Sequence, residues 1–60
     1  MSEQLHLTHR REYLRGRKDG GTDALADRDY RPRDGATGTA DERNAYSLGY
    51  RDGWDEALGA

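Results

Sequence analysis

The sequence predicts an all-α fold, a two-helix hairpin that arises from an internal duplication. Val, Ile and Phe, which strands favour, do not occur in the 60 residues. Residues 13–25 recur in modified form as residues 46–58, 33 positions later. In both copies the aromatic residues and glycines recur at helical spacing. Together these observations favour two similar helices that pack through one face each.

The second helix is predicted over residues 40–58. One face of this helix would carry a set of aromatic and small residues at i, i+3, i+4, i+7, i+8 and i+11, namely Tyr46, Gly49, Tyr50, Gly53, Trp54 and Ala57. Thr39 followed by Glu42 has the spacing of a capping box, which places the start near Ala40. Gly59 provides the stop signal.

The first helix is predicted over about residues 3–27, with Ser2 as its cap and Glu3 in its first turn. Its weaker stripe consists of Leu5, His9, Tyr13, Gly16, Gly20 and Ala24. An interior glycine costs about 1 kcal/mol relative to alanine, which makes residues 20–21 a weak point. The helix either continues there, breaks or kinks, or restarts at Thr22 and Asp23 as a short further helix. Residues 28–39, which contain the single proline Pro32, are predicted to be a linker of about a dozen residues.

The two copies of the repeat share six identical positions in one register. These are the pairs Tyr13/Tyr46, Gly16/Gly49, Asp19/Asp52, Gly20/Gly53, Ala24/Ala57 and Leu25/Leu58. The Gly-x-x-x-Gly spacing in each copy would let two helices approach closely. The expected packing or partner face is Tyr13, Gly16, Gly20, Tyr46, Gly49, Tyr50, Gly53 and Trp54. The alternative is that the glycines reflect codon bias and weak helices.

The small apolar content limits how stable the chain can be by itself. With no Cys, no Phe and six Leu, the sequence offers neither a disulfide nor a large core. We therefore expect one domain over residues 1–60 that a homodimer or a larger partner completes. A disordered chain is the remaining alternative. No segment has the length of a membrane span, so we expect no membrane association and a cytoplasmic location.

Catalytic and metal chemistry is not predicted. Ser2 and Ser47 lack the neighbours that activate a nucleophile. His6 and His9 lie one helical turn apart, but further ligands are not evident in the sequence. We therefore expect a protein that is not an enzyme, with no metal site and no cofactor.

Basic residues concentrate in the first helix and the linker, although the net charge is −2. The candidate RNA-binding residues are Arg10, Arg11, Arg15, Arg17, Lys18, Arg28, Arg31 and Arg33. Arginines interleaved with Tyr30 suit phosphate contact and base stacking. The alternative is a solvated flank whose charges pair with Asp19, Asp23 or the second helix.

Three stretches resemble the ribosome modulation factor family and its small phage-borne relatives. They are Tyr13-Leu14-Arg15-Gly16-Arg17-Lys18-Asp19-Gly20, Tyr30-Arg31-Pro32, and Tyr46-Ser47-Leu48-Gly49-Tyr50-Arg51-Asp52-Gly53-Trp54-Asp55-Glu56-Ala57. The resemblance covers roughly residues 10–58. It implies two short helices, a long linker, binding to ribosomal RNA, and the silencing or storage of ribosomes under stress.

Two functional hypotheses follow. In the first, the protein is a ribosome-associated modulator that binds ribosomal RNA through its basic first helix and linker. In the second, it is a protein–protein interaction module, such as a phage-encoded inhibitor or adaptor of a basic host protein. The second hypothesis uses the acidic residues of the second helix, which are Asp41, Glu42, Asp52, Asp55 and Glu56. Charge reversal in one half or the other distinguishes the two.

Overall fold

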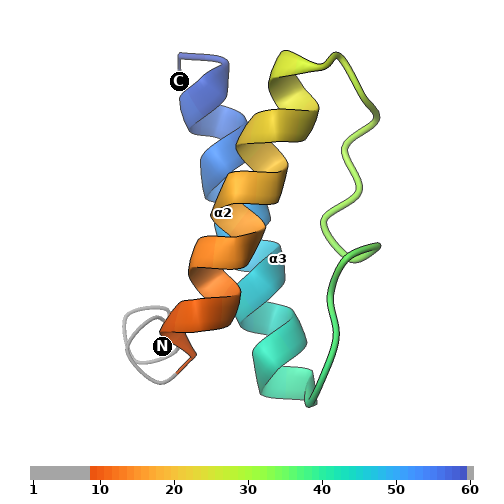
Figure 1. The fold of residues 1–60 in the computed structure, drawn as a ribbon, viewed down its shortest axis with the longest axis vertical. Coiled ribbons are helices and arrows are strands. Elements are labelled where there is room, and N and C mark those ends of the chain that lie inside the picture. Colours follow the sequence, from red (N-terminus) through yellow and green to blue (C-terminus); the bar gives the residue numbers. More distant parts are fainter. Residues whose placement is uncertain (1–8, 60) are drawn as a thin grey trace.

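The computed structural model describes residues 9–59, which form two packed helices, α2 (Arg10–Leu25) and α3 (Ala40–Ala57). The expected all-α two-helix fold is confirmed. The two helices run in the same direction, and the connection returns along the whole pair before α3 begins (Figure 1). This direction explains why the connection, residues 26–39, is long: a short turn can join only antiparallel neighbours.

Helix α2 is shorter than the expected helix over residues 3–27. Residues 3–8 of that prediction, with the expected cap Ser2, lie outside the described residues. His9 occupies the N-cap position, without a side-chain capping bond, rather than a place in the helical stripe. The helix ends at Leu25, and Asp27 adopts a positive φ of 59° that ends the helical path.

The weak point at residues 20–21 does not break the helix, because α2 continues through both glycines. Gly20 is buried against α3, whereas Gly21 is only partly covered. Packing against a neighbouring helix contributes more to helical stability than intrinsic propensity does. The low propensity of Gly20 is therefore outweighed by the close contact that its missing side chain permits.

Helix α3 begins at the predicted capping box. Thr39 accepts a hydrogen bond from the Glu42 backbone, and the Glu42 carboxylate accepts one from the Thr39 N–H at 2.8 Å. Leu58 is the C-cap, so the helix is one residue shorter than expected, and Gly59 follows with a φ of 80°. The start and stop signals in the sequence thus describe this helix closely.

The helices meet backbone to backbone at four glycines. A β-carbon at Gly16 or Gly20 would overlap the carbonyl oxygen of Tyr46 or Tyr50 on α3. A β-carbon at Gly49 would overlap the Tyr13 carbonyl oxygen, and one at Gly53 would overlap that of Arg17. The structure thus places these glycines as the close-packing interpretation expects.

The contacts across the interface are reciprocal. Gly16 lies against Tyr46, and the residues 33 positions away repeat this contact in reverse, with Gly49 against Tyr13. The contact of Gly20 with Tyr50 has the same counterpart in the contact of Gly53 with Arg17. Because each contact from α2 to α3 has an equivalent contact from α3 to α2, the two helices are related by a local two-fold axis. Such a relation about an axis along the helices requires them to run in the same direction.

Aromatic residues of α3 fill the space between the helix pair and the connection. Tyr46 and Tyr50 are buried together with Ala45, a core residue that the sequence analysis did not identify. Trp54 stacks on Tyr50 at a centroid separation of 6.0 Å and meets Tyr30 edge-on at 5.3 Å. Trp54 was expected on the packing or partner face, and its ring packs between Tyr50 of its own helix and Tyr30 of the connection.

Neither α2 nor α3 is long and apolar enough to cross a membrane.

Adjacent glycines in α2 provide a matched test of the interface. Gly20→Ala would force a methyl group into the Tyr50 backbone. We therefore expect the free energy of unfolding to fall by about 1–3 kcal/mol or more. At Gly21 a β-carbon would lie 3.6 Å from the Gly53 carbonyl oxygen, an ordinary contact. Gly21→Ala should therefore stabilise the protein by about 0.5–1 kcal/mol through helix propensity. Thermal and urea unfolding followed by circular dichroism measures both changes. Equal effects at the two positions would contradict the described interface.

Candidate functional site

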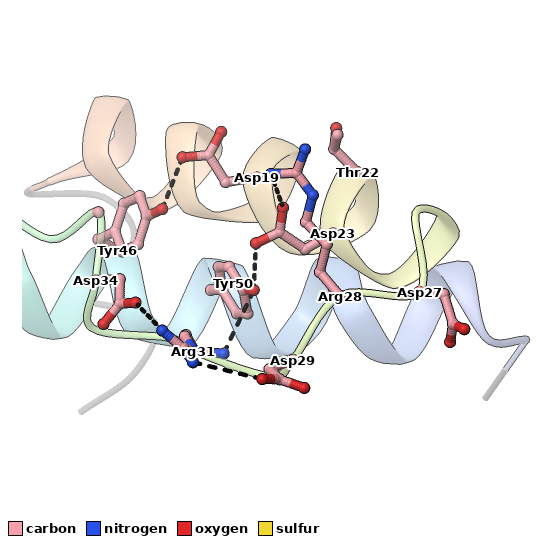
Figure 2. Close-up of a pocket in the computed structure, with 11 residues that line it drawn as sticks. Asp19, Thr22, Asp23, Asp27, Arg28, Asp29, Arg31, Asp34, Tyr46 and Tyr50 are labelled. Atoms are coloured by element: carbon pink, nitrogen blue, oxygen red, sulfur yellow. Dashed lines mark hydrogen bonds and ion pairs between the residues drawn. The ribbon is translucent and has the colours of Figure 1, made fainter.

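Three tyrosine hydroxyls donate hydrogen bonds from one helix to carboxylates of the other. Tyr46 donates to Asp19 at 2.6 Å and Tyr50 donates to Asp23 at 2.5 Å, as Figure 2 shows. Tyr13 donates to Asp52 at 2.6 Å, which is the reciprocal of the Tyr46 contact. These bonds fix the helices in register, and bonds to a charged acceptor are stronger than neutral ones.

The environment of these tyrosines keeps them protonated. Burial, followed by the hydrogen bond to Asp19, raises the pKa of the Tyr46 hydroxyl well above its ordinary value. Burial and the bond to Asp23 likewise raise the pKa of Tyr50. At Tyr13 the hydrogen bond to Asp52 is the main cause of the raised pKa. Each hydroxyl therefore remains a donor over the whole physiological pH range.

The fourth contact of this reciprocal set, the counterpart of the Tyr50–Asp23 bond, is an ion pair rather than a tyrosine hydrogen bond. Arg17 occupies the place in α2 that Tyr50 occupies in α3, and its guanidinium contacts the Glu56 carboxylate. Arg17 was predicted to bind RNA, but the structure directs it across the helix interface. The Arg17–Glu56 pair and the Tyr50–Asp23 bond thus serve equivalent positions with different chemistry.

Arg15 also belongs to the scaffold. Its guanidinium forms an ion pair with Glu12 at 3.1 Å and donates a hydrogen bond to the Gly35 carbonyl at 2.8 Å. The same group lies 4.6 Å from the centroid of the Tyr46 ring, in a cation–π arrangement. Arg15 therefore attaches the connection to the helix pair, and its contacts leave it less available for RNA than its sequence position predicts.

The acidic side chains of α2 all lie on the inward side of the helix. Asp19 and Asp23 accept bonds from tyrosines of α3, and Glu12 pairs with Arg15. The outward side then carries only basic, apolar and neutral polar groups. Charge is therefore separated across α2, although the chain as a whole has a net charge of −2.

We call this outward surface the basic face of α2 and define it as Arg10, Arg11, Leu14, Lys18 and Leu25. With 3.6 residues per turn, these positions fall within about a third of the helix circumference. All five are exposed, and within residues 9–59 the three cations pair with no carboxylate. Three of the eight predicted RNA-binding residues thus lie together on one surface, and their cations form no ion pair within residues 9–59.

The basic residues of the connection are divided between its two sides. Arg28 contacts Asp23 at 3.7 Å, and Arg31 lies between Asp29 and Asp34 at 3.4 and 3.5 Å (Figure 2). These ion pairs line an acidic groove between α2 and the connection. Arg33 is exposed, makes no ion pair within the described residues, and lines a separate groove against α3. Arg28 and Arg31 thus lie beside carboxylates, although their side chains stay 70% and 62% exposed, whereas Arg33 has no such partner among the described residues.

The acidic residues proposed as a partner surface on α3 are mostly engaged within the chain. Asp52 accepts a bond from Tyr13, Glu56 pairs with Arg17, and Glu42 completes the capping box. Asp41 and Asp55 are exposed and belong to no ion pair among the described residues. Most of this set therefore stabilises the fold.

The alternative in which the basic residues pair with Asp23 and the second helix holds for Arg28–Asp23 and Arg17–Glu56. The tyrosine bonds of Asp19 and Asp23 were not identified from the sequence, although a signal was present. In each copy of the repeat an aspartate stands six positions after the first tyrosine, as Asp19 does after Tyr13 and Asp52 after Tyr46. The bonds, however, cross from one copy to the other, which a single copy of the repeat does not reveal.

No group of three or more potential metal ligands occurs in the part of the chain that the structure describes. Neither protein-family models, nor curated proteins, nor solved structures match the chain. Inference about function therefore rests on the residues and their geometry.

The raised tyrosine pKa values predict a loss of stability at alkaline pH. An unfolded tyrosine ionises near pH 10, whereas the folded hydroxyls resist ionisation. Their contribution to stability is complete below about pH 10 and is lost as the pH rises through the folded-state pKa. We expect Tyr46→Phe to lower the free energy of unfolding by about 1–3 kcal/mol near neutral pH. It should also reduce the further loss on going to about pH 11.

Urea unfolding of the wild type and Tyr46→Phe at the two pH values measures both effects. Tyr30→Phe is the matched control, because the structure gives that hydroxyl no carboxylate partner within residues 9–59. An equal alkaline loss in wild type and Tyr46→Phe would show that Tyr46 does not contribute.

Proposed function

We propose that the protein is a non-enzymatic, ribosome-associated modulator that binds ribosomal RNA through the basic face of α2. The observation that supports the proposal is the separation of charge across this helix. Its carboxylates are engaged in bonds with α3 and Arg15, while Arg10, Arg11 and Lys18 are exposed and unpaired within the described residues. Cations that are presented in this way bind phosphate groups and release counterions.

The placement of these cations on a rigid helix supports the same proposal. The glycine interface and the tyrosine–carboxylate bonds hold α2 in place, so the side chains of its basic face project from a fixed support. Because the backbone that carries these cations is already ordered, binding restricts their side chains but not the main chain. Leu14 and Leu25, which are 43% and 78% exposed, would add apolar contact beside the phosphates.

The interaction-module hypothesis has weaker support. Asp52, Glu56 and Glu42 form contacts within the chain, so a basic partner would have to compete with them. Asp41 and Asp55 alone remain exposed and outside the ion pairs of residues 9–59. We therefore favour RNA over a basic protein as the partner.

Charge reversal on the basic face tests the proposal. We expect the wild type to co-sediment with ribosomes at low salt, and binding to weaken as salt rises. Arg11→Glu and Lys18→Glu should each weaken binding and lower the slope of log K against log salt by about one. The basic face has no ion pairs to lose among the described residues, so both variants should keep the wild-type circular dichroism spectrum.

Arg43→Glu is the matched control, because Arg43 is an exposed arginine on α3 outside the basic face. It should bind ribosomes as the wild type does. A wild-type protein that fails to co-sediment at low salt would overturn the proposal. Equal losses in Arg43→Glu and Lys18→Glu would show that the charge matters but its position on α2 does not.

A further inference from the structure

A second groove lies between the connection and α3, and its composition differs from that of the acidic groove. It has a volume of about 370 Å³, within the range of about 300–1,000 Å³ that small-molecule sites occupy. Its lining is Tyr30, Pro32, Arg33, Asn44, Ser47, Leu48 and Arg51. We call it the Tyr30 groove. Its lining contains two arginines and no carboxylate.

Tyr30 is the central feature of this groove. The residue is 47% exposed, although its ring is anchored edge-on against Tyr50 at 5.6 Å and against Trp54 at 5.3 Å. The two contacts fix the orientation of the ring and leave part of its surface open to solvent. An aromatic ring held in this way is a prepared surface for stacking, because little side-chain freedom remains to be lost.

The groove is held open by bonds that do not depend on a ligand. The Ser47 hydroxyl donates to the Pro32 carbonyl at 3.1 Å, and the Arg31 N–H donates to the Tyr50 hydroxyl at 3.4 Å. Both bonds attach the connection to α3. The positions of Tyr30 and Arg33 relative to α3 are therefore set by the fold.

The cations of the groove remain accessible. Arg33 is exposed and makes no ion pair within residues 9–59, and the side chain of Arg51 is 57% exposed with one ion pair to Asp52 at 3.6 Å. Asn44 adds an amide that can both donate and accept hydrogen bonds. On the other side of the connection, Asp29 and Asp34 line the acidic groove, which would repel phosphate. The Tyr30 groove, whose lining has arginines but no carboxylate, is therefore the more favourable of the two for an anionic ligand.

We propose that the Tyr30 groove binds an unpaired nucleotide of single-stranded RNA, with the base stacked on Tyr30 and the phosphates near Arg33 and Arg51. This inference rests on the proposed function and adds a preference for single strands. Base faces inside a duplex are already stacked on their neighbours, so Tyr30 can stack only on an unpaired base.

The test compares a fluorescein-labelled oligouridine with a labelled RNA hairpin whose two strands are joined by a non-nucleotide linker, so that every base is paired. Each RNA is titrated with the full chain and followed by anisotropy. Tyr30→Ala should weaken oligouridine binding by about 5- to 150-fold, the range expected for loss of one aromatic–base stack. Binding of the hairpin should change by less than twofold. Tyr30→Phe keeps the ring and should bind oligouridine like the wild type.

A second variant guards against a folding defect in Tyr30→Ala. Arg33→Glu removes no ion pair within residues 9–59, so it should keep the wild-type circular dichroism spectrum and weaken oligouridine binding more than hairpin binding. If both variants bind oligouridine as tightly as the wild type, the proposed groove is wrong. A wild-type protein that binds the hairpin and oligouridine equally also overturns the inference.

The two proposals can fail separately. If Lys18→Glu weakens ribosome binding while Tyr30→Ala leaves oligouridine binding unchanged, the groove is wrong and the ribosome proposal stands. If oligouridine binding depends on Tyr30 but the protein does not co-sediment with ribosomes, the groove stands and the RNA must come from another source.

Discussion

The close approach of two helix backbones at four glycines is the constraint from which the rest of this structure follows. Gly16 and Gly20 of α2 receive carbonyl groups of α3, and Gly49 and Gly53 receive carbonyl groups of α2. Such an interface needs few large side chains, because backbone atoms themselves supply the dispersion contacts. A chain without Phe, Val or Ile can therefore form a packed helix pair.

Close approach also determines which polar groups the interface must satisfy. The large tyrosine side chains beside the glycines project past the opposite helix, and their hydroxyls end next to carboxylates there. Each buried hydroxyl thereby gains a partner. The same bonds hold the acidic groups of α2 on its inward side and leave the outward side basic. The packing of the core and the charge pattern of the surface thus have one origin.

The parallel direction of the helices has a further consequence for the surface. The connection must return along the full pair (Figure 1), and it separates two grooves of opposite character, with residues 28–31 extended and residues 32–35 forming a turn. Alternate residues of an extended chain point to opposite sides. Asp29 and Arg31 accordingly line the acidic groove, and Tyr30 and Pro32 line the other. A tight antiparallel turn would provide neither surface.

The sequence by itself determined the helical class, the glycine faces and both ends of α3, because these depend on local spacing and on capping chemistry within a few residues. It did not determine the helix direction, the continuity of α2 through Gly20 or the contacts that Arg15 and Arg17 make outside their own helix. Those features depend on contacts between residues far apart in the chain. Arg15 and Arg17 resemble Arg11 in sequence, yet only the packing of α3 against α2 assigns the first two to the scaffold and leaves the third exposed.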